Sequence, residues 1–239
     1  MAFNGTITFR GTASSSYPLT IITPPQITHP ELIMEEYTIP GRDGTLYGTN
    51  PYRSSAQISV TMALVAQDGL TNNVSKYQTS YRQVKSWLQG TGKLIIGDSQ
   101  DSYYEVQKVA ITADDRTILR YGTLTVVFTV YPYEFLDSGD TSVSPGTVTN
   151  PADKCAPLYK ITGSGSGTLT VNNKTMSFTS TGTLYIDTRR YIAYDSSNNN
   201  KNSVLSGDYD DLKLDNGANT VAITSGFTLN IYPKWGYNL

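Results

Sequence analysis

The sequence predicts a mainly β protein with two β-rich domains and a single α-helix. Three observations support this fold class. Short runs of alternating apolar and polar residues recur along the 239 residues, and a period of two is typical of half-buried antiparallel strands. One segment follows helical spacing instead, and a polar stretch containing Gly and Ser interrupts the apolar pattern after residue 136.

The clearest strand patterns lie in the first half. Segments 57–65 and 123–131 each place every second residue on one apolar face: Ile58, Val60, Met62 and Leu64 in the first, Leu124, Val126, Phe128 and Val130 in the second. A third strand is predicted over 103–112. The adjacent aspartates at 114–115 favour a turn before a further strand over 117–121.

A single amphipathic helix is predicted at about residues 73–89. Asn72 or Asn73 can cap its start, and Gly90 can end it. Trp87 lies beside an apolar stripe with helical spacing: Val74, Tyr77, Tyr81, Val84 and Leu88. We expect this stripe to pack on the sheet; the alternative is a binding face.

A composition change predicts the domain boundary. The stretch 137–146 has almost nothing to bury, so it is predicted to be a linker or hinge. Every glutamate precedes it: Glu31, Glu35, Glu36, Glu105 and Glu134. We therefore predict an N-terminal domain over 1–140, and a linker with a C-terminal domain over 141–239.

The second half contains shorter strands separated by turn signals. The run 163–167 of Gly and Ser is expected to be a flexible lead-in to a strand over 168–171. Asn172-Asn173 is typical of a hairpin turn, after which 174–179 returns. Further strands follow at spacings that favour a small β-sandwich: 183–187, 190–194, 220–223 and 227–231.

Several classes of chemistry are disfavoured by composition. One histidine, His29, and one cysteine, Cys155, cannot supply a His–Cys metal cluster, an intramolecular disulfide or a second catalytic His. The net charge of −2 argues against dedicated nucleic-acid binding. We see no signal peptide or membrane-spanning run, and the single cysteine is compatible with synthesis in a reducing cytoplasm. Cys155 is expected to be a small, partly buried apolar residue.

Acidic groups do not form a recognisable catalytic or metal-binding pattern. Glu35 and Glu36 are adjacent in a predicted strand, so their side chains point to opposite faces and cannot converge on one bond. An aspartate group in the C-terminal half lacks the alternation and the later Glu of a calcium loop: Asp208, Asp210, Asp211 and Asp215. We predict no catalytic, cofactor-binding or metal-binding residues.

Two groups remain as candidate binding residues. The segment 39–52 could contact another subunit through its turn, Pro40, Gly41, Arg42, Asp43 and Gly44, or it could be an ordinary hairpin turn with solvated charges. Near the C-terminus, Tyr232, Trp235 and Tyr237 could stack on a sugar. The alternative, which we favour, is packing between the sheets of the sandwich.

Five pieces of the chain together resemble the distal tail proteins of siphovirus-type bacteriophages, which have long non-contractile tails. Their order and spacing cover nearly the whole sequence. The pieces are Ile39–Gly44; Trp87–Gly90 with Gly92–Ile95; Tyr121–Leu124 leading through Phe128 to Tyr131–Tyr133; Val148–Pro151 with Pro157–Gly165; and Leu205–Tyr209, Leu212 and Gly217–Thr220 with Ile231–Trp235.

The resemblance implies an N-terminal β-sandwich with a helix and a projecting hairpin or belt, and a C-terminal galectin-like β-sandwich. It implies a structural role without enzymatic activity, in which six copies close into a ring at the virion tail tip. The implied partners are sister copies, the major tail tube protein, the tail-tip or tail-associated lysin protein, and receptor-binding or baseplate proteins. The chain lacks the larger outer-domain insertions of some relatives.

Two other functions stay open from the sequence. The C-terminal sandwich could be a carbohydrate-binding module or adhesin that contacts the host surface. A glycan hydrolase that uses only Asp and Glu is the third hypothesis; activity on cell wall that is lost on changing a single carboxylate would support it.

Overall fold

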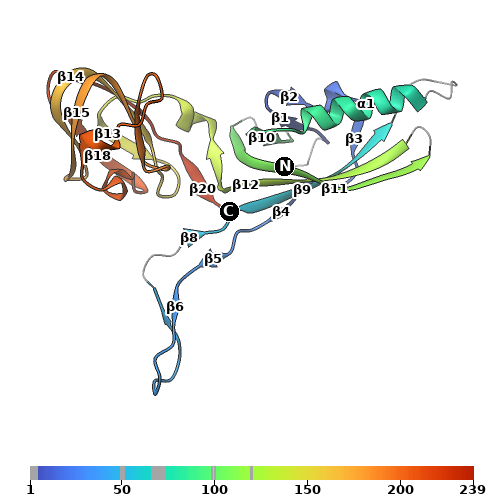
Figure 1. Ribbon diagram of the computed structural model, residues 1–239, viewed down its shortest axis with the longest axis horizontal. Coiled ribbons are helices and arrows are strands. Elements are labelled where there is room, and N and C mark those ends of the chain that lie inside the picture. Colours follow the sequence, from blue (N-terminus) through green and yellow to red (C-terminus); the bar gives the residue numbers. More distant parts are fainter. Residues whose placement is uncertain (1–4, 49–51, 66–73, 98, 100, 119–120) are drawn as a thin grey trace. The chain divides into compact units, whose positions relative to one another are not determined.

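A computed structural model describes residues 5–48, 52–65, 74–97, 99, 101–118 and 121–239. The chain forms two compact units, one of Met1–Glu134 with Leu239 and one of Phe135–Asn238. Both units are built from antiparallel strands around their own apolar core, with one α-helix in the described part of the chain (Figure 1). The predicted fold class, mainly β with β-sandwich units, is confirmed.

The first unit contains one large sheet, a helix and a two-stranded extension. Along the sheet the strand order is β2-β1-β10-β11-β12-β9-β3, and β4 also pairs with β9. The elements are β1 (Ile7–Phe9), β2 (Thr12–Ala13), the 3-10 helix η1 (Ser14–Ser16), β3 (Leu19–Ile21), β4 (Gln26–Thr28), β5 (Leu32–Ile33), β6 (Glu36–Tyr37), β7 (Leu46–Tyr47), β8 (Tyr52–Arg53), β9 (Ala56–Val65), α1 (Val74–Trp87), β10 (Gly92–Ile96), β11 (Ser102–Ile118) and β12 (Tyr121–Leu136).

Strands β9 and β12 form the centre of the first core. They pair antiparallel from Tyr121↔Val65 to Val130↔Ala56, which places Phe128 opposite Ile58 and Val126 opposite Val60. The apolar alternation predicted for both strands is confirmed, because the alternating residues of each strand are fully buried. Each such side chain contributes about 1.5–3 kcal/mol when it leaves water.

The predicted helix is confirmed as α1, and its apolar stripe packs on the sheet. Val84 and Leu88 are buried with the sheet residues. The Trp87 ring lies 6.4 Å from Phe9, and its indole Nε1 donates to the Phe9 carbonyl at 3.2 Å. After the helix Gly90 has φ +92°, a conformation that glycine adopts without penalty. The predicted caps, Asn72 and Asn73, lie outside the described residues.

The turn predicted at Asp114-Asp115 is wrong. Strand β11 continues through both residues to Ile118. The side chains over 112–115 are exposed, so solvated charges are compatible with a strand at this point. Exposed side chains at this end of the strand give no apolar period, so the adjacent aspartates predict a turn that is not there.

The second unit contains a sheet with strand order β13-β18-β14-β15-β16, with β19 on β14 and β17 on β15. The predicted hairpin turn is confirmed, since Asn172 and Asn173 connect β14 to β15 with φ of 48° and 69°. The elements are η2 (Asp137–Asp140), β13 (Gly146–Asn150), β14 (Leu158–Val171), β15 (Lys174–Asp187), β16 (Ile192–Asp195), η3 (Asn202–Val204), β17 (Leu205–Ser206), η4 (Tyr209–Leu212), β18 (Gly217–Ile223), β19 (Thr228–Tyr232) and β20 (Gly236–Asn238).

The polar stretch 137–146 is not a free linker. Its first residues form η2, and Val143 exchanges two backbone hydrogen bonds with Ile231, at 2.7 and 2.9 Å. Gly139 is buried under the chain near Trp235, where a Cβ would lie 2.3 Å from a backbone nitrogen. The linker prediction failed because these contacts use backbone atoms, which residue polarity does not reveal.

The Gly-Ser run 163–167 is a paired strand rather than a flexible lead-in. It lies inside β14, and each of its residues pairs with β15, from Gly163↔Gly182 to Gly167↔Phe178. A Cβ on Gly163 would lie 2.6 Å from the Phe227 ring, and one on Gly167 would lie 2.9 Å from it. The glycines therefore make room for an aromatic side chain above the strand.

The remaining predicted strands of the second unit are also found in its sheet. The predicted strands 183–187 and 174–179 are one continuous strand, β15, which pairs with β16 as expected. The strand predicted over 227–231 belongs here as β19, paired with β14. Leu239 belongs to the first unit, where its amide donates to the Pro132 carbonyl at 3.2 Å.

Candidate interaction surface

A two-stranded arm carries the predicted contact loop. We define the arm as residues 31–48 and 52–54; it continues from β4 and leads back into β9 (Figure 1). Its strands pair with each other in two short ladders, Leu32↔Arg53 with Ile33↔Tyr52, and Glu36↔Tyr47 with Tyr37↔Leu46. None of the described side chains from 22 to 55 is buried. The projecting hairpin predicted from the resemblance is thus present.

The predicted contact residues form the tip of this arm. Pro40, Arg42 and Asp43 are exposed, and the amide of Arg42 donates to the Ile39 carbonyl at 3.1 Å. Gly41 and Gly44 have φ of +80° and +85°, so the turn depends on glycine at both positions. Within the described residues neither Arg42 nor Asp43 forms an ion pair.

The arm holds most of the exposed large apolar side chains of the described chain. Of ten such residues six lie on it: Leu32, Met34, Tyr37, Ile39, Tyr47 and Tyr52. Tyr47 is 59% exposed and Tyr52 is 60% exposed. Exposed apolar surface gathered in one place is typical of an interaction site. The sequence predicted the turn but not this surface. Apolar residues lie on both faces of these strands, so they do not alternate with polar residues as in a half-buried strand.

Opposite faces of the β6–β7 ladder carry different groups. Residues directly opposite in an antiparallel pair share a face, so Glu36 lies with Tyr47 on one face and Tyr37 lies with Leu46 on the other. The Tyr37 hydroxyl donates to Glu35, and this hydrogen bond raises the pKa of Tyr37. The arm carries four carboxylates and two guanidinium groups, a net charge of −2: Glu31, Glu35, Glu36 and Asp43 against Arg42 and Arg53.

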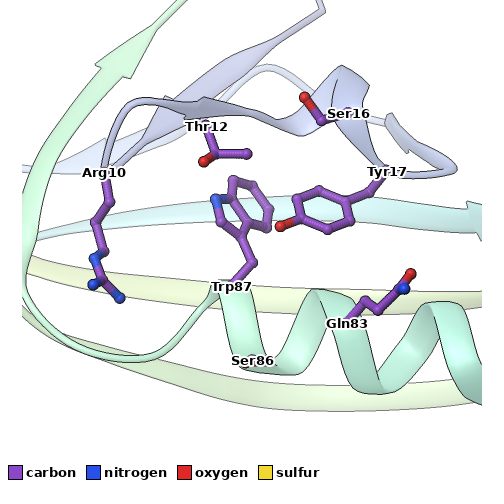
Figure 2. A pocket seen from close by; sticks show the side chains of 7 residues that line it. All are labelled: Arg10, Thr12, Ser16, Tyr17, Gln83, Ser86 and Trp87. Carbon is purple, nitrogen blue, oxygen red and sulfur yellow. The ribbon is translucent and has the colours of Figure 1, made fainter.

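A second surface of the first unit is an open groove between α1 and the chain around η1. Its volume is about 600 Å³. Figure 2 shows the rings of Tyr17 and Trp87 side by side in it, with Arg10 at one end and Gln83 at the other. The two rings lie 5.1 Å apart. We call this the α1 groove; its lining residues are Arg10, Thr12, Ser16, Tyr17, Gln83, Ser86 and Trp87.

The candidate sugar-stacking residues do not present a common aromatic face. Trp235 is only 6% exposed and packs in the second core, so its ring is not available to a ligand. This corrects the sugar-stacking interpretation for Trp235 in favour of core packing. Tyr232 is half-buried. Tyr237 is 44% exposed, and its hydroxyl donates to the Pro151 carbonyl at 3.3 Å.

The aspartates of the second unit bind separate partners. Asp211 lies 2.5 Å from the Lys174 ammonium, Asp210 lies 2.5 Å from Lys213, and Asp215 lies 3.0 Å from Lys154. Asp208 accepts from the Asp210 amide at the start of η4. No group of three or more His, Cys, Asp or Glu able to hold a metal occurs among the described residues.

The single histidine and cysteine occupy ordinary positions. His29 is exposed next to the arm. Cys155 is buried in the second core, as expected, and burial raises the pKa of its thiol to about 12. Since the thiolate is the reactive form of cysteine, Cys155 is unreactive at neutral pH.

Comparisons with known proteins identify the fold. No family model and no curated protein matches the sequence. The structure is similar to a crystal structure of the SPP1 Dit (gp 19.1) protein, described as a paradigm of the hub adsorption apparatus in Gram-positive infecting phages. The similarity covers 97% of this chain and 98% of that chain, with a TM-score of 0.62 and 14% sequence identity. The likeness therefore extends over the whole chain, in fold rather than in sequence.

Among the residues described, α1 is the only α-helix, and no helix combines the length and apolarity that crossing a membrane requires.

Proposed function

We propose that this chain is a distal tail hub of a long-tailed bacteriophage, a structural protein whose copies close into a ring. In this role it joins the tail tube to the tail-tip protein and supports receptor-binding or baseplate proteins. The observation that carries the proposal is the arm, on which six large apolar side chains are exposed. A fold shared over nearly the full length with a phage hub protein supports it.

The physics of the arm explains why it requires a partner. An isolated two-stranded hairpin is at best marginally stable in water. Here the ladders contain two residue pairs each, and aromatic side chains occupy both faces of the β6–β7 ladder. A partner surface that covers these side chains removes apolar area from water and orders the arm.

In a closed ring, every subunit can make such a contact with its neighbour. Head-to-tail association joins two different surfaces of the same chain, and it closes when the rotation per subunit divides a full turn. Each subunit is then held at two interfaces, which raises the effective concentration at the second contact. Six copies, the number implied by the sequence resemblance, is the ring size we propose.

The mass of the purified chain in solution tests this proposal. We expect multi-angle light scattering to show a ring-sized species for the wild type and a monomer for Tyr37→Ser/Tyr47→Ser, with the apparent dissociation constant raised at least about tenfold. Tyr191→Ser is the matched control, because Tyr191 is an exposed tyrosine of the second unit. A wild-type monomer at high concentration, also in the presence of the tube protein, would contradict the proposal.

Location in the virion gives a second readout. Electron micrographs of phage particles labelled with an antibody against this chain should show label at the tail tip. Label on the heads would rule out the hub role. Specific binding of the chain to host glycans without any ring would instead support the adhesin hypothesis.

A further inference from the structure

The outer face of the β14–β15 hairpin is built from uncharged hydroxyl side chains. Every second residue of β14 from 162 to 170 is Ser or Thr, and each lies opposite a Ser or Thr of β15. These side chains are exposed or half-buried, whereas Leu169, Met176 and Phe178 on the other face are buried. Charged residues are the usual occupants of exposed positions, so this face is chemically distinct. Its pairs are Thr162↔Thr183, Ser164↔Thr181, Ser166↔Thr179, Thr168↔Ser177 and Thr170↔Thr175.

Part of this face forms the floor of an open groove in the second unit. Its volume is about 610 Å³, within the range of about 300–1,000 Å³ that is typical of small-molecule sites. Residues 203–206 of η3 and β17 line the side next to β15, and Thr224 lines the side next to β14. None of the lining residues carries a charge. We call this the hydroxyl groove; its hydroxyl residues are Ser166, Thr168, Ser177, Thr179, Ser203, Ser206 and Thr224.

Strand pairing aligns four of these hydroxyl groups in a row. Ser177 lies opposite Thr168 on one side and opposite Ser206 on the other. The Thr168 hydroxyl lies 3.1 Å from that of Thr224. The row therefore crosses β17, β15, β14 and the residue that follows β18, with successive strands about 4.8 Å apart. Because the strands fix this spacing, the hydroxyl groups are already positioned before any ligand arrives.

Much of the hydrogen-bonding capacity of the groove is unused within the chain. A hydroxyl group can donate one hydrogen bond and accept two. The contact of 3.1 Å between the Ser166 and Thr179 hydroxyls uses only one donor of the two. Among the described residues, the side chains of Ser177, Ser203 and Ser206 have no hydrogen-bond partner. The groove thus offers donors and acceptors side by side.

We infer that the hydroxyl groove binds a neutral carbohydrate chain. A sugar presents hydroxyl groups that both donate and accept, which is the pattern that the groove offers. An ionic ligand would lose hydration there without meeting an opposite charge. A protein surface would find little apolar area, since Val204 and Leu205 are half-buried.

This site differs from the one considered from the sequence, because none of Tyr232, Trp235 and Tyr237 lines the groove. Recognition here comes from hydrogen bonds rather than from stacking. The inference goes beyond the proposed hub function and does not depend on ring closure, because the whole groove belongs to one unit of one chain.

Binding of defined hexasaccharides to the full chain tests the inference by isothermal titration calorimetry. The neutral probes are the hexasaccharides of α-linked glucose, β-linked glucose and N-acetylglucosamine, and the acidic probe is that of galacturonate. We expect a neutral probe to bind with a dissociation constant of about 1 mM or lower, and the acidic probe to bind at least about tenfold more weakly. Absence of binding by every neutral probe, or tighter binding of the acidic one, would overturn the inference.

Salt gives a further readout of the same titration. Because no lining residue is charged, raising NaCl from 0.05 to 1 M should change the dissociation constant of the neutral probe less than about twofold. A tenfold or larger change would show that charged side chains bind the sugar, which contradicts recognition in this groove.

Removing hydroxyl groups tests the location of the site. Ser177→Ala/Ser206→Ala deletes two opposite hydroxyls of the central row, and we expect the dissociation constant to rise at least about fivefold. Thr162→Val/Thr183→Val is the matched control, because it deletes an opposite pair on the same outer face but outside the groove. The control should bind as the wild type does. Equal binding by both variants would place the sugar elsewhere, provided that thermal melting shows both to be folded.

Threonine methyl resonances locate the sugar without any substitution. Addition of the neutral probe should shift the methyl signals of Thr168, Thr179 and Thr224 and leave those of Thr162 and Thr183 in place. Shifts that spare the three groove threonines would refute the assignment.

Light scattering on the same sample keeps this inference separate from the hub proposal. A ring that binds no neutral probe contradicts only the carbohydrate site. A chain that binds the probe in the hydroxyl groove but forms no ring, even with the tube protein, supports the carbohydrate site and contradicts only the hub proposal.

Discussion

At the scale of single residues, the second unit depends on glycines that clear space above β14. Gly163 and Gly165 occupy alternate positions of this strand, with φ of +147° and +123°. Both would be strained by a side chain, but they differ in surroundings. A Cβ at Gly163 would lie 2.6 Å from the Phe227 ring, whereas the ring is 3.9 Å from a Cβ at Gly165.

This difference predicts unequal costs for the same substitution. Gly163→Ala should lower the free energy of unfolding by about 1–3 kcal/mol more than Gly165→Ala, because overpacking adds to backbone strain only at the first position. Urea denaturation of the two variants measures the difference. Phe227→Leu should recover part of the loss in Gly163→Ala and none in Gly165→Ala. Equal costs for both alanines would show that the ring moves aside freely.

At the scale of elements, the loop after β16 is organised by one carboxylate. Asp195 accepts hydrogen bonds from the Ser197 amide at 2.9 Å and from the Asn199 amide and side chain at 3.0 Å. The bonds from Asn199 and Ser197, helped by the Lys201 charge, lower the pKa of Asp195 to about 2. The loop is therefore held by a group that stays ionised well below neutral pH.

The lowered pKa of Asp195 determines in which direction its contribution to stability changes with pH. The stabilisation from Asp195 is fully present above its unfolded-state pKa of about 3.9 and is lost as the pH falls through about 2. The Ser197 and Asn199 amide resonances should titrate with a midpoint near 2 in the wild type. In Asp195→Asn this titration should be absent. A wild-type midpoint at or above 3.9 would show that these hydrogen bonds do not favour the charged form.

Elements also show where sequence reasoning succeeds and where it fails. Strands β9 and β12 were predictable because one face of each is buried, so apolar residues recur at every second position of the sequence. The far end of β11 and the Gly-Ser part of β14 were missed, because their order comes from backbone pairing. The turn of the arm was predictable from Pro40, Gly41 and Gly44. The exposure of the arm and the α1 groove was not, because both depend on which residues the fold brings together.

At the scale of the whole molecule, the charge of the arm makes assembly of the proposed ring sensitive to salt. The arm has a net charge of −2 among its described residues, so the surface that receives it is expected to carry the opposite charge. Charges across an exposed interface are screened over about 8 Å at 0.15 M ionic strength and about 3 Å at 1 M. The exposed apolar side chains of the arm contribute through burial, which NaCl does not screen. The ring should therefore weaken with salt without disappearing, and the loss should trace to the charges of the arm.

A variant of the arm isolates that electrostatic part. Glu36→Gln/Asp43→Asn keeps the exposed apolar side chains of the arm and brings its net charge from −2 to zero. Between 0.05 and 1 M NaCl we expect the wild-type ring dissociation constant to rise about tenfold, equivalent to about 1.4 kcal/mol, and that of the variant to change less than threefold. Sedimentation velocity across this salt range measures both. Equal salt dependence of the two proteins would place the interacting charges elsewhere, since removing two charges from the arm would then have left the electrostatics of assembly unchanged.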